Sequence, residues 1–176
     1  LYLDLNIKYH VGYDASTSIE ITPDSILISG PKKQVSKINE LRSSFLSLDD
    51  VKSNFEKTLL IMKPENSKNI NFSNESVQIK GNVEKFTEGS FKIPFKIINL
   101  PSDIQLATLT KMVEVVFIVG LSDFNNMNIN SFRVECDFEV SEKNNLGYLI
   151  PKIVMKPDVV KSIKVLPNRI DFLIQK

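Results

Sequence analysis

A repeated stretch constrains this chain more than any other feature of its sequence. Residues 61–79, IMKPENSKNINFSNESVQI, return 93 positions later as residues 154–172, VMKPDVVKSIKVLPNRIDF. Both copies open with an apolar residue, Met-Lys-Pro and an acidic residue, and both close on apolar residues two positions apart. An ungapped match of this length indicates one structural unit used twice. The repeated residues serve architecture, so the repeat itself is not a catalytic motif.

Period-two alternation of apolar and polar residues predicts strands through the first half. The predicted strands cover residues 1–11, 17–22, 26–29, 45–48, 55–62, 70–72 and 77–83. Gly30-Pro31 ends one of them, and the apolar spacing that follows predicts a short amphipathic helix over residues 32–44. Pro64 with Asn66 and Ser67 predicts a loop, because proline cannot donate to a sheet ladder. Gly81 and Gly89 are interpreted as turns or bulges.

The second half replays this order. Residues 93–97 match residues 5–9 at an offset of 88, and Cys136-Asp137 falls where Leu48-Asp49 did. Strands are predicted at residues 104–108, 112–119 and 149–155, with a shorter helical turn or loop at 123–130. We therefore expect two tandem domains, residues 1–89 and residues 90–176. No flexible linker is visible, so we expect them to meet end to end with limited freedom.

The composition narrows the function classes. Lys plus Arg number 22 against 21 Asp plus Glu, which gives no electrostatic footprint for nucleic acid. Pairs such as Lys32-Lys33, or Lys161 with Lys164, do not form a basic stripe. Cys136 is the one cysteine of the sequence, so an intrachain disulfide and a cysteine metal cluster are excluded. The longest apolar run is far shorter than the roughly 18 residues of a membrane span.

The order of prolines, glycines and apolar residues in the first half resembles that of the YbbR-like domain. The residues that carry the resemblance are Pro23, Ile26, Ile28, Gly30-Pro31, Leu48-Asp49, Lys63-Pro64, Val77 and Ile79. It extends to the second half, which departs from the pattern at Leu121, where a proline would follow Gly120. These residues are structural in kind, so the resemblance carries no catalytic residues with it.

The resemblance implies a mainly β chain with at most one short helix per domain. Each domain would be a small twisted sheet, similar to the C-terminal domain of ribosomal protein L25. Family members occur in tandem behind a single N-terminal membrane helix, on the extracytoplasmic side of the bacterial cell membrane. Those with a known role regulate a membrane-bound diadenylate cyclase, the enzyme that makes cyclic di-AMP. By resemblance, we expect a non-catalytic, membrane-anchored module of the bacterial envelope that binds and regulates a protein partner, without a cofactor.

Other readings remain open. A structural or glycan-binding envelope module is the alternative, and it would need aromatic platforms that a chain with no Trp and four Tyr offers sparingly. An enzyme would have to use His10, with Asp4 or Asp14 as orienting carboxylate and Ser16, Ser18 or Cys136 as nucleophile. The alternation places His10 on a polar strand face with Asn6 and Lys8, so we expect a solvated histidine and no catalytic or metal-binding residues.

Three further groups of residues carry hypotheses. Asp49-Asp50 is one carboxylate cluster, and Glu135, Asp137 and Glu139 form another, interpreted as the wet face of one extended strand and, as an alternative, a cation site. Lys68 and Lys161 occupy equivalent repeat positions, which leaves a shared binding role open. The phenylalanines of residues 86–95 are a candidate docking surface, although Phe91 and Phe95 are expected in the core.

Overall fold

The computed structural model describes residues 1–65 and 67–175, so Asn66, part of the predicted loop, lies outside the described residues. The chain divides into two compact units, unit 1 (Leu1–Lys85) and unit 2 (Phe86–Lys176). The sequence places this boundary four residues later, between Gly89 and Ser90. One long strand, β10 (Val83–Ile98), begins in unit 1 and continues as the first strand of unit 2.

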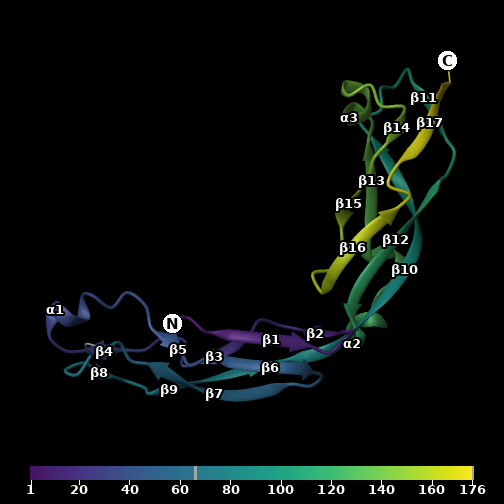
Figure 1. The fold of residues 1–176 in the computed structure, drawn as a ribbon. Coiled ribbons are helices and arrows are strands. Elements are labelled where there is room, and N and C mark those ends of the chain that lie inside the picture. Colours follow the sequence, from purple (N-terminus) through teal and green to yellow (C-terminus); the bar gives the residue numbers. More distant parts are fainter. Residues whose placement is uncertain (66, 176) are drawn as a thin grey trace. The chain divides into compact units, whose positions relative to one another are not determined.

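Unit 1 is built from short strands and one helical turn (Figure 1). A four-stranded sheet has the order β3-β9-β7-β5, and the pairs β1-β6 and β4-β8 complete the unit. The start of β10 also pairs with β2. The elements are β1 (Leu5–Tyr9), β2 (Tyr13–Ala15), β3 (Glu20–Thr22), β4 (Ile28–Ser29), α1 (Lys32–Val35), β5 (Arg42–Ser43), β6 (Leu46–Val51), β7 (Phe55–Met62), β8 (Asn71–Phe72) and β9 (Ser76–Gly81).

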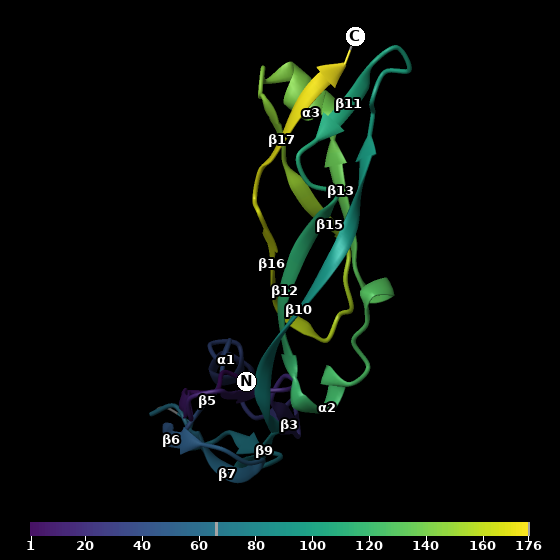
Figure 2. The same ribbon diagram turned by 90° about the vertical axis from the view of Figure 1, so that its right-hand side faces the viewer.

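Unit 2 has longer strands. One sheet has the order β15-β13-β10-β12-β16, and a second has the order β11-β17-β14. Figure 2 shows α3 and the β11–β17 pair at one end of this unit and α2 at the opposite end. The elements after β10 are β11 (Gln105–Thr108), β12 (Met112–Gly120), α2 (Leu121–Phe124), the 3₁₀ turn η1 (Ile129–Ser131), β13 (Arg133–Asp137), α3 (Phe138–Lys143), β14 (Tyr148–Leu149), β15 (Pro151–Met155), β16 (Val160–Leu166) and β17 (Ile170–Gln175).

The two units share five strand pairings, whereas the β10-β12 ladder of unit 2 has no counterpart among the described strands of unit 1. The parallel pair β1-β6 corresponds to β10-β13. The antiparallel pairs β3-β9, β4-β8, β5-β7 and β7-β9 correspond in turn to β11-β17, β12-β16, β13-β15 and β14-β17. These five correspondences match both the direction and the chain order of the paired strands, as a structural unit used twice requires.

The register of these ladders places the two copies of the repeat at equivalent positions. Met62 lies opposite Arg42 in unit 1, and Met155 lies opposite Arg133 in unit 2. The predicted offset of the first strand is wrong by two residues. When Leu48 is aligned with Cys136, the parallel ladders align residues 5–7 with residues 95–97, an offset of 90. A shift of two residues keeps every side chain on its predicted face, because strand periodicity is two.

Each unit has its own core, and the core of unit 2 is larger. In unit 1 the buried side chains are Leu41, Leu59, Ile61, Val77 and Ile79. In unit 2 they are Ile93, Val113, Val115, Phe117, Val119, Phe132, Val134, Cys136, Phe138, Leu149, Val160 and Ile170. The last strand of each unit is expected to bury its apolar residues. Val77, Ile79 and Ile170 are buried and Phe172 is half-buried, but Ile174, expected on the same buried face, is 52% exposed. Phe91 and Phe95 pack against the core of unit 2, also as predicted.

The mainly β prediction is confirmed, but the helices differ from the predicted ones. The helix expected over residues 32–44 is only α1, because residues 42–43 pair with β7 as strand β5. Unit 2 carries α2, η1 and α3 where at most one short helix was expected. The strand predicted at residues 149–155 is split at Ile150 into β14 and β15. Tertiary pairing overrides local propensity at these places.

Candidate functional site

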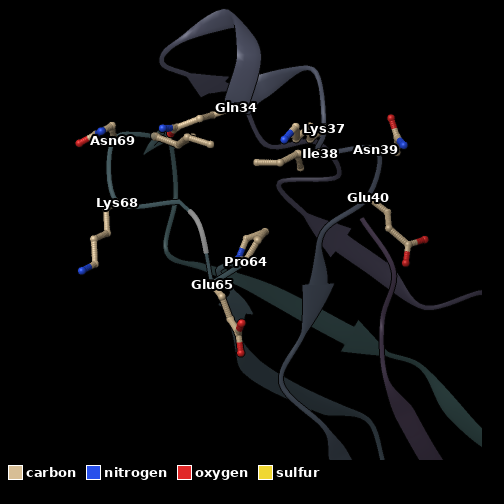
Figure 3. Close-up of a pocket in the computed structure, with 10 residues that line it drawn as sticks. Gln34, Lys37, Ile38, Asn39, Glu40, Pro64, Glu65, Lys68 and Asn69 are labelled. Carbon is tan, nitrogen blue, oxygen red and sulfur yellow. The ribbon is translucent and has the colours of Figure 1, made fainter.

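The largest pocket lies in unit 1, between α1 with the segment that follows it and the loop after β7 (Figure 3). It is an open pocket of about 800 Å³. Gly30 lets this loop approach closely, because a Cβ atom there would lie 2.7 Å from the carbonyl oxygen of Asn69. Its lining residues are Gln34, Lys37, Ile38, Asn39, Glu40, Pro64, Glu65, Lys68, Asn69 and Ile70.

The lining of this pocket is polar and electrically balanced. Each side of the pocket carries one lysine and one glutamate, Lys37 with Glu40 and Lys68 with Glu65. Arg42 donates from Nε and Nη2 to Oε1 of Glu40, at 3.0 and 2.9 Å. Gln34 extends from α1 toward the Asn69 side of the loop, and its buried Oε1 accepts no hydrogen bond from the described residues. A buried amide oxygen without a donor is destabilising. The pocket can therefore hold a small polar group that donates hydrogen bonds.

Lys68 and Lys161 occupy different surroundings. Lys68 lines this pocket, whereas Nζ of Lys161 lies 4.4 Å from the centre of the Phe86 ring, a cation–π distance. A shared binding role for Lys68 and Lys161 stays a prediction, because the surroundings of the two side chains have no geometry in common.

His10 lies beside a different carboxylate from the two that the sequence suggested. Its Nδ1 contacts Oδ1 of Asp50, and Nζ of Lys52 lies 3.0 Å from Oδ2 of the same carboxylate. Tyr13 packs edge-on against the imidazole ring at 5.8 Å. The hydrogen bond from His10, followed by that from Lys52, lowers the pKa of Asp50 below its usual range. The cluster is an ion-pair network at the end of the β1-β6 ladder.

The proposed nucleophiles do not join this histidine. Ser16 and Ser18 are exposed, and the backbone N–H of Ser16 donates to the carbonyl of Asn82. Cys136 belongs to unit 2 and is fully buried, and burial raises the pKa of its thiol to about 11. A thiol with so high a pKa is a poor nucleophile at neutral pH. The interpretation of Cys136 as a small buried core residue fits this environment.

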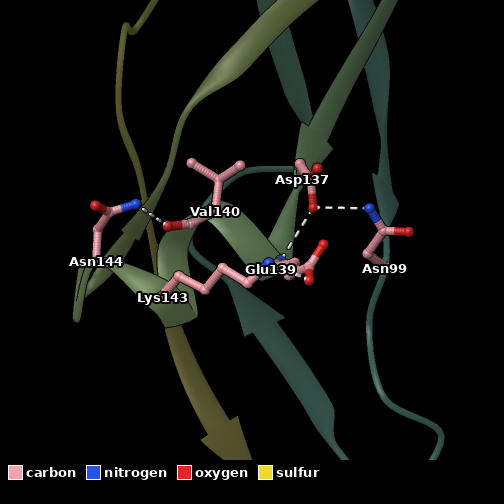
Figure 4. Close-up of polar contacts among 6 residues, drawn as sticks. All are labelled: Asn99, Asp137, Glu139, Val140, Lys143 and Asn144. Atoms are coloured by element: carbon pink, nitrogen blue, oxygen red, sulfur yellow. Dashed lines mark hydrogen bonds and ion pairs between the residues drawn. The ribbon is translucent and has the colours of Figure 1, made fainter.

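The prediction that the carboxylates of residues 135–139 share one strand face is only partly right: Glu135 and Asp137 alternate with buried residues on β13, but Glu139 lies in helix α3. Strand β13 ends at Asp137, whose Oδ1 accepts from the backbone N–H of Glu139 at 3.0 Å and caps helix α3 (Figure 4). Oδ1 of Asp137 also accepts from Nδ2 of Asn99 at 3.0 Å, and Glu139 pairs with Lys143 one turn along the helix. Asp137 is therefore an N-cap, a structural role.

The alternative reading of these carboxylates as a cation site finds no support. Among the described residues, no group of three or more His, Cys, Asp or Glu side chains is arranged to hold a metal ion. The Asp49-Asp50 pair is likewise divided between cations, since Asp49 lies 3.3 Å from Lys8 while Asp50 contacts His10 and Lys52.

The sequence reasoning missed a set of exposed apolar side chains beside the Met-Lys-Pro repeat. In unit 1, Leu60 and Met62 on β7 are 62% and 57% exposed, with Phe45 62% exposed beside them. The strand before the second Met-Lys-Pro likewise exposes Val154 and Met155, at 50% and 38%. A signal was present, because residues 59–62 are all apolar, and an unbroken apolar run puts apolar side chains on both faces of a strand.

The geometry defines a tandem pair of β units with five shared strand pairings and with apolar surface beside the repeated turn. No family model matches the sequence, and no curated protein matches it. A search of solved structures found a YbbR-like protein from Streptococcus pneumoniae TIGR4 that is 10% identical. The alignment covers 99% of this chain and 92% of that chain, with a TM-score of 0.33.

Proposed function

We propose that this chain is a non-catalytic interaction module of two YbbR-like domains, anchored on the outer side of a bacterial cell membrane, that binds and regulates a membrane protein. One observation carries the proposal: the strand leading into Met-Lys-Pro exposes large apolar side chains in both units. Single exposed apolar residues are ordinary. Met62 and Met155 are the exposed residues at equivalent repeat positions, and in unit 1 Phe45, Leu60 and Met62 are exposed on adjoining segments. Contiguous exposed apolar side chains mark a protein-binding surface.

The unit 1 surface is continuous across two strands. Beyond the end of β5, the backbone N–H of Ser44 donates to the carbonyl of Leu60 at 2.7 Å, which holds Phe45 beside β7. Arg42 on β5 lies opposite Met62, and its guanidinium stands 5.3 Å from the ring of the exposed Tyr2. Apolar and aromatic side chains with an arginine among them are the composition that protein interfaces favour.

Regulation follows if the partner has two conformations that contact the module differently. A surface held by sheet ladders docks on one of them better than on the other and shifts the equilibrium by that difference in affinity. The resemblance names a membrane diadenylate cyclase as the partner. The membrane anchor is also part of the proposal, and no helix of the described residues is long and apolar enough to cross a bilayer.

The glycan-binding alternative receives less support. Recognition of a sugar ring was expected to use an aromatic platform, and the ten residues that line the largest pocket include none. This alternative stays a prediction, and a glycan array probed with the purified chain tests it.

Affinity capture of the tagged protein from its own membranes tests the proposed function. We expect a membrane protein to be recovered and to be lost from the Leu60→Asp/Met62→Asp variant. Val11→Asp is the matched control, because Val11 is 92% exposed in the turn between β1 and β2, outside both copies of the repeat. Recovery of no specific partner, or equal recovery with all variants, contradicts the proposal. Recovery of a partner other than a cyclase contradicts only its finer part.

A further inference from the structure

Two strand edges of unit 2 flank an apolar cavity. β15 and β16 are the outermost strands of the order β15-β13-β10-β12-β16, and in the described part of the chain no ladder joins them to each other. They are consecutive in the chain, linked by a turn in which the N–H of Val160 donates to the carbonyl of Pro157 at 3.1 Å. The cavity, of about 480 Å³, is lined by Ile153, Val154, Met155, Lys156 and Ile163.

These two edges are not covered by a further strand among those described, and the carbonyl of Val160, at the start of β16, accepts from Nζ of Lys156 at 3.2 Å. Within the described residues, β15 forms its ladder with β13 alone and β16 with β12 alone. Unpaired strand edges are the surfaces to which an extended segment of another protein adds. Main-chain hydrogen bonds hold such a segment, and its alternate side chains enter the pockets of the receiving sheet.

The side chains of the two edges specify what such a segment must carry. Ile153 and Ile163 are half-buried at the cavity and would contact apolar side chains of every second residue. Residues 151–166 carry four lysines and one acidic residue, Asp158. Lys156 donates to the carbonyl of Val160 and Lys161 lies over the Phe86 ring, so the exposed Lys152 and Lys164 are the lysines that a bound segment would meet. On the neighbouring strands, Glu135 lies opposite Lys152, Glu114 opposite Leu166, and Arg133 opposite Met155, which leaves the rim basic.

We propose that β15 and β16 form a docking slot for an extended segment of a partner protein in which apolar residues alternate with Asp or Glu. Its apolar side chains face Ile153 and Ile163, and its carboxylates face Lys152 and Lys164. This inference rests on the proposed function and gives it a site and a partner chemistry. Opposite charges across the slot fix the register and reject basic segments.

A designed peptide tests the slot. The probe is a capped seven-residue peptide of alternating valine and glutamate, titrated into the isotopically labelled 176-residue chain and followed by NMR. We expect amide shifts at residues 151–156 and 160–166. A valine–lysine peptide, and a valine–glutamate peptide with N-methylated valines, should not bind. No shifts up to roughly 1 mM peptide, shifts elsewhere, or equal binding of the lysine peptide would overturn the proposal.

A charge-reversal variant provides a second test of the slot. We expect Lys152→Glu/Lys164→Glu to raise the Kd of the glutamate peptide at least about tenfold. The matched control is Lys57→Glu/Lys80→Glu, two exposed strand lysines of unit 1, which should leave it unchanged. If the membrane partner is captured equally by the Lys152→Glu/Lys164→Glu variant, the slot is refuted and the proposed function stands. If no partner is captured at all, the proposed function is what fails.

Discussion

Replacing Gly89 by alanine should destabilise unit 2, because the position is closed by aromatic rings. Gly89 lies opposite Phe117 in the β10-β12 ladder. A Cβ atom at residue 89 would lie 2.6 Å from Cζ of Phe117 and 2.9 Å from Cε2 of Phe124, closer than real side chains approach. Phe117 is 1% exposed and its ring packs against Phe91 and Phe132, with centroids 5.5 and 4.9 Å away, so it has little room to move.

The expected change in the free energy of unfolding is the balance of two opposing contributions. Overpacking a close-packed core costs about 1–3 kcal/mol. Removing a glycine stabilises the folded state by about 0.4–1 kcal/mol, since the unfolded chain loses conformational freedom. We therefore expect Gly89→Ala to lower the free energy of unfolding by roughly 1–2 kcal/mol. Urea denaturation followed by NMR signals assigned to each unit measures this change where it occurs, with the slope against urea unchanged.

Two companion variants make this reasoning refutable. At Gly147 a Cβ atom would meet nothing within 4 Å, so Gly147→Ala should change stability by less than about 0.5 kcal/mol. Phe117→Leu removes the nearest ring atom, so the double variant with Gly89→Ala should be less destabilised than the sum of the single changes. Equal effects of the two glycine substitutions, or strict additivity of the pair, would show that the close approach is not the cause.

Three more outcomes are expected. Leu149→Ala should cost about 2–5 kcal/mol in urea unfolding, because this side chain is fully buried in the core of unit 2, and a loss below about 1 kcal/mol would contradict that packing. The thiol of Cys136, with its pKa raised to about 11 by burial, should react with Ellman's reagent at pH 8 far more slowly in the folded protein than in urea. The pKa of Asp50 should lie below its usual range in an NMR titration and rise in His10→Gln, since the His10 hydrogen bond is the largest cause of the shift. A carboxyl with a lowered folded-state pKa adds stability above its unfolded pKa, so the contribution of Asp50 should vanish as pH falls through its folded pKa.

The repeat accounts for what the sequence could predict. Proline cannot continue a ladder, so Pro64 and Pro157 mark where β7 and β15 end, and both strands do end at the preceding methionine, one residue before the lysine. Alternation then assigns the buried face, and Val77 and Ile79 are buried as it requires. These features are local, since they depend on residues that are neighbours in the chain.

The candidate site depends on contacts that no local pattern encodes. His10 and Asp50 are 40 residues apart and meet only because β1 and β6 pair in parallel. Residues 135–140 alternate as a strand would, yet Asp137 caps the backbone of a helix that starts at Phe138. Over so short a stretch, period-two alternation predicts a strand whereas an N-cap residue predicts the start of a helix. Here the chain forms the helix.

The repeat also shows how one framework acquires two recognition chemistries. The two copies have equal length, but Asn66-Ser67 in the first is Val159-Val160 in the second. Asparagine and serine favour loops, and Pro64, Glu65, Lys68, Asn69 and Ile70 line the polar pocket of unit 1 before β8 begins at Asn71. Valine favours strands, and β16 begins at Val160, which carries an apolar edge along the slot of unit 2. The repeated framework therefore supplies the position, and the side chains that differ between the two copies set what each unit presents there.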